Sequence, residues 1–189
     1  MIPILHNIPI FSISIRPPPI PPFEGMHVLV VHFPIALLLV APLFMFLAMV
    51  MPVRLRWCSF AALILLALGT AGVLAAIATG EAARDAVEKG SDAMFRVLAE
   101  HEQLAGIVRN VFIIVTVLYG LFVLLPSVIR RWITASYLVP VHAVFLLVLL
   151  GANLLVANTA HTGGRLVHQY GVRAAMAEPD EVEGLGVGG

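Results

Sequence analysis

Four long apolar stretches dominate the pattern of hydrophobic and polar positions along this chain. They cover residues 28–51, 57–80, 104–126 and 136–160, and most charged residues fall between or beyond them. A helix needs about 20 residues to cross the hydrocarbon layer of a bilayer, and each backbone amide inside that layer must be bonded within the segment. The pattern therefore predicts an all-α, polytopic membrane protein with a bundle of four transmembrane helices.

The polar connection 81–103 has helix-compatible charge spacing. Arg84 and Glu88 are four residues apart, and Gly90 interrupts the pattern. Oppositely charged residues at this spacing stabilise a helix surface. We expect a short extramembrane helix between the second and third transmembrane helices.

Charge distribution predicts the orientation of the bundle. The connections 51–57 and 127–135 contain arginines and no acidic residue, which is typical of cytoplasmic loops. The connection 81–103 and the acidic tail then lie outside. We expect a multi-pass protein of the bacterial inner membrane with both termini on the periplasmic side.

The two ends of the chain differ from the apolar core. Residues 1–25 alternate isoleucine with proline, which predicts a disordered, proline-rich extension and makes Met26 a second candidate for the start, beside Met1. Residues 174–189 are acidic and glycine-rich and are expected to form a disordered tail. The transmembrane domain is then expected to cover residues 26–173.

Composition narrows the possible functions. Hydrophobic residues make up 60% of the chain and charged residues 12%, and the mean hydropathy is +1.00. A formal net charge of zero without a lysine and arginine cluster gives no basis for binding nucleic acid. The single Cys58 excludes an internal disulfide and a multi-cysteine metal site, and no CxxCH motif for covalent haem is present.

Five histidines fall on the expected outer side of the membrane. His27 and His32 open the first span, His101 precedes the third, and His161 and His168 close or follow the fourth. Ionisable groups at membrane depth usually face the bundle interior and mark a functional site, and two imidazoles are a common ligand pair for b-type haem. The preferred axial pair is His32 with His101, and His161 or His168 forms a second pair or a substitute. His27 is expected at the mouth of the bundle.

Small residues and one arginine add to this hypothesis. Gly69, Gly72, Ala76 and Gly80 form a stripe that either admits a flat macrocycle or allows close helix packing. Arg109 lies in the third span, where its partner is a haem propionate, a quinone oxygen, an acid or helix carbonyls.

The fourth span is followed by HTGGRLVHQYGV, residues 161–172. Paired glycines commonly end a helix. If the helix continues instead, His161, Arg165 and His168 share one face.

Several blocks resemble a known family. They are HVLVVHFPIALLLVAPLF, AAIATGEAA, EHEQLAG and HTGGRLVHQYGV. Together they are similar to the bacterial four-helix membrane family known as domain of unknown function 2231, over about residues 26–173. Some relatives are fused to c-type cytochrome domains, which implies redox work. This chain departs from many relatives in reading His168, Gln169, Tyr170 before the final GV, where they have tyrosine, any residue, histidine.

Three functions are compatible with these residues. The first is a haem b protein that carries electrons between the quinol pool and a c-type cytochrome, with His27, His32, His101, His161, His168 and Arg109 as candidate binding residues. The second is a copper or zinc protein that uses His32, His101 and His161. The third is a structural membrane subunit without a cofactor. Together these alternatives favour an electron carrier or membrane subunit over a stand-alone enzyme. A homo-oligomer and a subunit of a larger membrane complex are both compatible with them.

Overall fold

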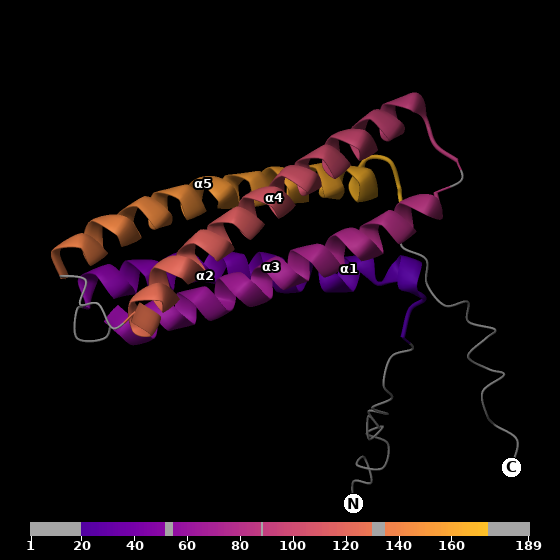
Figure 1. Ribbon diagram of the computed structural model, residues 1–189. Helices are drawn as coiled ribbons and strands as arrows, with labels where there is room; N and C mark the ends of the chain where they lie inside the picture. Colours follow the sequence, from indigo (N-terminus) through magenta and orange to yellow (C-terminus); the bar gives the residue numbers. More distant parts are fainter. Residues whose placement is uncertain (1–19, 52–54, 88, 130–134, 174–189) are drawn as a thin grey trace, which may run out of the picture. The chain divides into compact units, whose positions relative to one another are not determined.

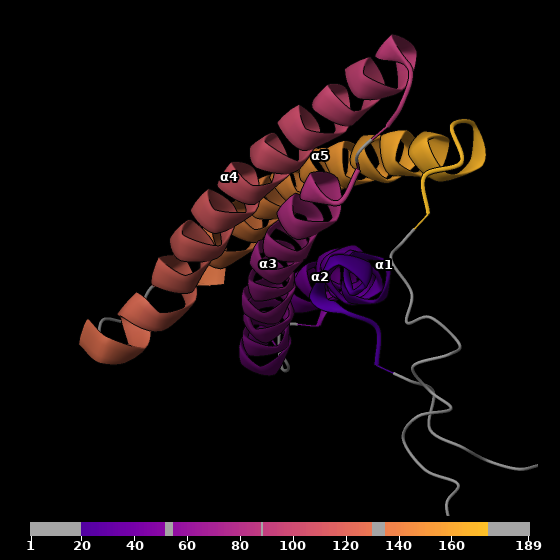
Figure 2. The same ribbon diagram turned by 90° about the vertical axis from the view of Figure 1, so that its right-hand side faces the viewer.

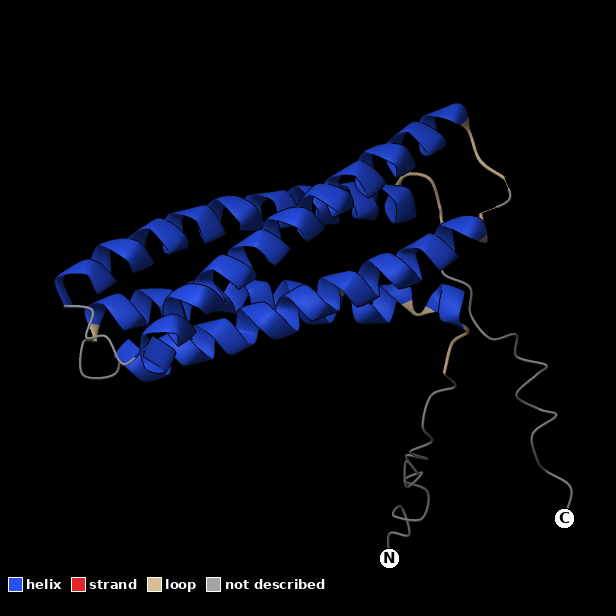
Figure 3. Ribbon diagram, viewed as in Figure 1, coloured by secondary structure: helices blue, strands red, loops and turns tan. Residues whose placement is uncertain are grey.

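A computed structural model describes residues 20–51, 55–87, 89–129 and 135–173, and their side chains except those of 126–137. The helices belong to one compact unit, Pro21–Met176, which is described here by itself. Its described residues form helices and short connections and contain no strand (Figure 3). Of the ends expected to be disordered, residues 1–19 and 174–189 lie outside the described residues.

The first span consists of two consecutive helices, α1 (His27–Val30) and α2 (His32–Val50). They are separated at Val31. Pro34 accounts for this interruption, because its ring nitrogen carries no hydrogen and cannot bond the carbonyl of Val30. The remaining spans are the single helices α3 (Leu55–Asp85), α4 (Asp92–Ile129) and α5 (Ala135–His168). All four spans are long and apolar enough to cross a membrane, which confirms the predicted fold class.

The helices extend beyond the apolar stretches at one end of the bundle. Helix α3 continues to Asp85 and α4 begins at Asp92, so the residues expected to form a separate short helix belong to these two helices instead. Extending an existing helix avoids the cost of nucleating a new one, and this favours continuation. Gly90 lies in the connection between them, as predicted.

Helix α5 also continues past its expected glycine end. It runs through Gly163 and Gly164 to His168, so the alternative in which the helix continues is correct. The chain turns at Gly171, whose φ of 70° lies in the left-handed region that favours glycine. The backbone N–H of Gly171 donates to the carbonyl of Val167 at 3.2 Å.

The spans form two hairpins that pack side by side. Helices α2 and α3 form the first hairpin, and α4 and α5 form the second (Figures 1 and 2). The hairpins meet where α2 packs on α5 and α3 packs on α4. Among the described residues, the diagonal pairs α2 with α4 and α3 with α5 make no backbone contact. The core between the hairpins contains Leu38, Met45, Leu66, Phe112, Tyr119 and Leu149, all fully buried.

Small residues on α3 allow close packing of the first hairpin. A Cβ atom on Gly69 would lie 2.6 Å from Leu38 Cδ2, and one on Gly72 would lie 3.0 Å from Pro34 Cβ. These glycines therefore bring α2 close to α3, as in other membrane helix pairs. Of the two interpretations of the stripe, close packing accounts for these two positions.

The outer surface of the bundle is apolar. Leu147 and Leu154 are 69% and 68% exposed, and many other large aliphatic residues lie on the same outer faces. Continuous apolar surfaces of this extent are rare on soluble proteins but are stable against lipid. The fold is therefore that of an integral membrane bundle.

Candidate functional site

One histidine of the first hairpin docks onto the end of α3. His27, the first residue of α1, donates from Nδ1 to the carbonyl of Ala76 at 2.8 Å, with Thr79 Oγ1 at 3.4 Å. The ring lies over Gly80, where a Cβ atom would stand 3.0 Å from Cε1 of His27. A carbonyl only accepts hydrogen bonds, so the Nδ1 atom of His27 carries a proton.

A histidine of the second hairpin docks onto α5 in the same way. His101 on α4 donates from Nδ1 to the carbonyl of Thr159 at 3.0 Å and to Thr162 Oγ1 at 3.1 Å. Its ring lies over Gly163, where a Cβ atom would stand 3.1 Å from Cε1. The same hydrogen-bond logic places a proton on Nδ1 of His101.

The two histidine rings lie next to each other. The centroids of His27 and His101 are 6.5 Å apart, and the ring planes are perpendicular at 89°. With Nδ1 protonated, each neutral ring keeps its lone pair at Nε2, and neither Nε2 forms a hydrogen bond to any residue in the described ranges. Histidines that bind metals commonly hold the other ring nitrogen against a backbone carbonyl in this way.

The surroundings of the two rings repeat each other residue by residue. One constant shift along the chain relates Ala76 to Thr159, Thr79 to Thr162 and Gly80 to Gly163. Each threonine also donates to the carbonyl that accepts the histidine proton. The signal is readable in the sequence as AIATG at 76–80 and TAHTG at 159–163. It adds three residues, Thr79, Thr162 and Gly163, that were not predicted as partners of the histidines, whereas Gly80 belongs to the predicted stripe of small residues.

The repeat continues into the core. Thr70 on α3 donates to the carbonyl of Phe112 on α4 at 3.5 Å, and Asn153 on α5 donates to the carbonyl of Leu38 on α2 at 3.2 Å. Asn153 follows Thr70 by 83 positions, as Gly163 follows Gly80. Phe112 follows Leu38 by 74 positions, as His101 follows His27, so the two bonds are equivalent. The hairpins are therefore two copies of one unit, related by a pseudo-two-fold axis along the bundle. Equivalent residues that meet, as His27 and His101 do, lie beside that axis.

His32, expected to pair with His101, points away from it. The side chain is exposed, and Nδ1 donates to the carbonyl of Val28 on the preceding turn at 2.6 Å. Positions 27 and 32 are about 140° apart around a helix, so the two rings cannot face the same neighbour. The structure brings His27, not His32, against His101.

The remaining predicted residues lie outside this pair. His161 and His168 are exposed on α5. Arg109 is half-buried on α4, and its Nε donates to Asn110 Oδ1 at 3.1 Å. Within the described residues, no three histidine, cysteine or carboxylate side chains gather closely enough to hold a metal ion, so the trio His32, His101 and His161 is not brought together.

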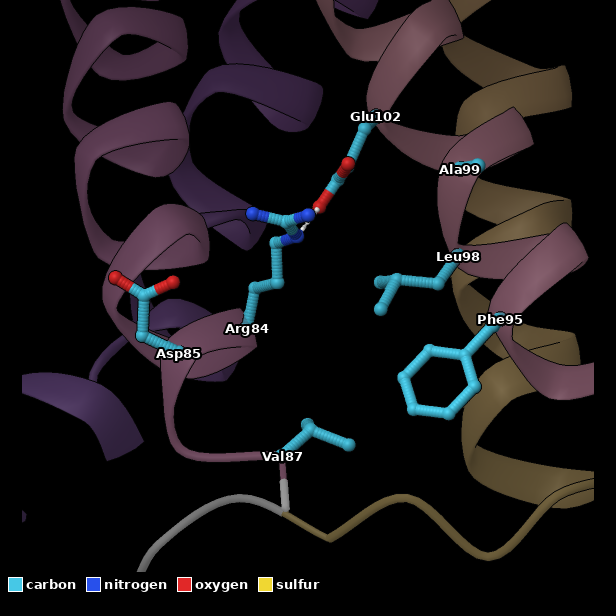
Figure 4. Close-up of a pocket in the computed structure, with 7 residues that line it drawn as sticks. All are labelled: Arg84, Asp85, Val87, Phe95, Leu98, Ala99 and Glu102. Atoms are coloured by element: carbon cyan, nitrogen blue, oxygen red, sulfur yellow. Dashed lines mark ion pairs between the residues drawn. The ribbon is translucent and has the colours of Figure 1, made fainter. Parts of the chain in front are cut away.

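An open cleft of about 410 Å³ lies between the ends of α3 and α4 (Figure 4). Arg84 and Glu102 reach across it and form an ion pair of 2.7 Å between Nε and Oε1, while Val87, Phe95 and Leu98 supply apolar walls. Arg84 follows Gly80 by one turn and Glu102 follows His101. The cleft is therefore beside the histidine pair along both helices.

The fold and its apolar surface define an integral membrane protein of the four-helix type. Over residues 24–176 the chain matches the family described as "Predicted membrane protein (DUF2231)", and it belongs to that family. The resemblance drawn from the sequence blocks is confirmed. No curated protein and no solved structure matches the chain.

Proposed function

We propose that His27 and His101 are the axial ligands of one b-type haem, and that the protein carries electrons between a membrane quinol and a c-type cytochrome. The observation that supports this most directly is the pair itself: two adjacent imidazoles, each with Nδ1–H bound to a backbone carbonyl and Nε2 left without a partner among the described residues.

The pair suits a haem better than a bare metal ion. A porphyrin supplies four nitrogens, so its iron needs only two protein ligands, whereas structural zinc takes four. With metal–nitrogen bonds of about 2.0–2.1 Å, two rings that share one metal ion have centroids roughly 6 Å apart. The separation of 6.5 Å between His27 and His101 is compatible with that arrangement. Copper or zinc would need further ligands beyond this pair.

The chain itself would orient both ligands. The carbonyls of Ala76 and Thr159 hold the Nδ1 protons and so direct both Nε2 lone pairs, while Gly80 and Gly163 leave space for the rings. A bound haem would supply a one-electron redox centre. Two histidine ligands would leave no free position on its iron, which would favour electron transfer over oxygen chemistry.

The orientation of the bundle in the membrane predicts on which side the redox partners lie. If the basic connections face the cytoplasm, the histidine pair lies at the periplasmic end of the bundle, in a bacterial inner membrane. A c-type cytochrome on that side and a quinol within the bilayer are then the expected partners.

The visible spectrum of the purified protein tests the haem. We expect a Soret band, with sharp α and β bands after reduction by dithionite. Absence of these bands after expression with ample haem would overturn the proposal, and metal analysis of the same sample would test for copper or zinc.

Matched histidine variants test the pairing. His27→Ala and His101→Ala should each lose the spectrum, whereas His32→Ala and His161→Ala should keep it, because those side chains are exposed. Loss of the spectrum in His32→Ala with retention in His27→Ala would contradict the assigned pair.

A further inference from the structure

A second pair of polar side chains meets at the opposite end of the bundle. His142 on α5 is 1% exposed, and its Nε2 lies 2.8 Å from Oγ of Ser59 on α3. Nδ1 of His142 donates to the carbonyl of Leu138 at 2.7 Å, and Ser59 Oγ lies 2.7 Å from the carbonyl of Leu55. The bond between Ser59 and His142 is the only side-chain hydrogen bond that joins α3 to α5 among the described residues.

The position of this pair follows from the repeat. Ser59 and His142 are 83 positions apart, the same shift that relates Gly80 to Gly163. They are therefore equivalent residues of the two hairpins and meet across the pseudo-two-fold axis, as His27 and His101 do at the other end. Even their backbone acceptors, Leu55 and Leu138, are equivalent.

Counting hydrogens shows that this pair has two complete bonding states. Nδ1 of His142 carries a proton, because a carbonyl accepts it. Ser59 has one hydroxyl hydrogen and two acceptors within 2.8 Å, namely His142 Nε2 and the Leu55 carbonyl. When His142 is neutral, the hydroxyl donates to Nε2. When His142 is protonated, Nε2–H donates to Oγ and the hydroxyl turns to the Leu55 carbonyl.

Two aromatic rings pack against the imidazole. The centroids of Phe122 and Tyr119 lie 5.1 and 5.9 Å from that of His142, both in edge-on arrangements. Ser59 is the fifth residue of α3, so the pair lies roughly 6 Å along the helix from its first described residue.

The titratable groups near this pair are few. Helix α4 contributes Tyr119, whose hydroxyl is buried without a partner in the described residues, and α3 contributes Cys58, half-buried beside Ser59. Arg56 of α3 is exposed and lies over the Phe60 ring. The last turns of α2, residues 43–51, contain no titratable residue. Arg54, Arg130 and Arg131 lie outside the described residues.

We propose that His142 and Ser59 form a proton-binding site at the end of the bundle opposite the histidine pair. A proton from water adds to the lone pair of His142 Nε2, no other bond breaks, and the only further movement is rotation of the Ser59 hydroxyl toward Leu55. Both states keep every polar atom of the pair bonded, so the bundle takes up or releases this proton without repacking. Proton binding requires no haem at the other end, and the two proposals stand or fall separately.

Nitrogen-15 NMR of histidine-labelled protein in lipid bilayers tests the site, with the His142 signal assigned by its loss in His142→Gln. Between about pH 8 and about pH 4, we expect His142 to pass from the Nδ1–H tautomer to the doubly protonated form. A His142 that stays neutral over this range overturns the site.

Serine variants test the role of the hydroxyl. Ser59→Thr keeps the hydroxyl and should preserve the second protonation, whereas Ser59→Ala should leave His142 neutral over the same range. Ser91→Ala is the control, because it removes a serine hydroxyl at the start of α4, at the other end of the bundle, and it should behave as the parent does. The signals of the other histidines report whether each variant is folded. If Ser59→Ala titrates like the parent protein, Ser59 does not form the site.

Discussion

At the scale of single residues, Gly80 and Gly163 set how closely each histidine ring approaches the neighbouring helix. Each glycine lies directly beneath a ring whose Nδ1 is fixed by a backbone carbonyl. The ring cannot retreat without stretching that bond. These two glycines therefore allow each ring to lie close against the neighbouring helix.

We predict that Gly80→Ala destabilises the bundle by about 1–3 kcal/mol, the usual cost of adding a methyl group to a well-packed site. The new Cβ atom would stand 3.0 Å from His27 Cε1 and 3.1 Å from Nδ1. Thermal unfolding in detergent, followed by helical circular dichroism, measures the change. Gly164→Ala is the control: its Cβ meets nothing within 4 Å, and alanine favours a helix. A Gly80→Ala protein as stable as Gly164→Ala would contradict this account.

At the scale of helices, the contact between α2 and α3 depends on a glycine against a buried leucine. Gly69 faces Leu38, which is fully buried in the core between the hairpins. Close approach of the two helices here also allows Asn153 to reach the Leu38 carbonyl from α5.

Gly69→Ala should separate α2 from α3. Its Cβ atom would lie 2.6 Å from Leu38 Cδ2 and 2.7 Å from Cγ, so we expect a loss of about 2–3 kcal/mol in unfolding free energy. Resistance to a denaturing detergent, measured by loss of helical signal, provides the comparison. Gly151→Ala on α5, where a Cβ meets nothing within 4 Å, should be neutral. Equal effects of the two variants would show that helix approach is not limited at Gly69.

At the scale of the whole molecule, the two hairpins are repeats joined by the short connection between α3 and α4. Each hairpin contributes one side of the core and one histidine of the pair. We expect fragments 1–89 and 90–189, produced in one cell, to associate and to purify together through a tag on either fragment. A break after residue 72, within α3, is the control and should prevent assembly. Failure of the 1–89 and 90–189 fragments to associate would contradict the repeat as an assembly unit.

Orientation is also a property of the whole chain. Because arginines fall in two connections and acids at the other end, we predict that residue 89 faces the periplasm and residue 56 the cytoplasm. In a Cys58→Ala background, an impermeant thiol reagent should label Lys89→Cys in intact cells, and Arg56→Cys only after permeabilisation. The reverse labelling pattern would invert the bundle and move the histidine pair to the cytoplasmic side.

The sequence was sufficient to predict the four spans, because runs of more than 20 apolar residues have no other stable arrangement in a bilayer. It did not locate the ends of α3, α4 and α5. Hydropathy reports where lipid ends, whereas alanine-rich polar turns such as 81–85 continue the helix into water. The break at Val31 also depends on Pro34, whose effect on a first turn varies with its neighbours.

The histidine pair was only partly predictable. A collection of histidines at one end followed from the spans, but the choice between His27 and His32 depended on which face of the first helix meets α3. The matching segments 76–80 and 159–163 contain that information, since each places a threonine and a glycine beneath one ring. Ser59 gave no such signal, because nothing in the sequence around it marks His142 as its partner.

The repeat has a further consequence for how the two ends of the bundle differ. Two separate, identical hairpins would form a homodimer, and any residue on its axis would face a copy of itself. Joining the hairpins in one chain removes that constraint. One end places like opposite like, histidine against histidine. The other places serine against histidine, a pair of different residues that an exactly symmetric dimer cannot have on its axis. A single chain thus allows an almost symmetric scaffold to carry a different chemistry at each end of the bundle.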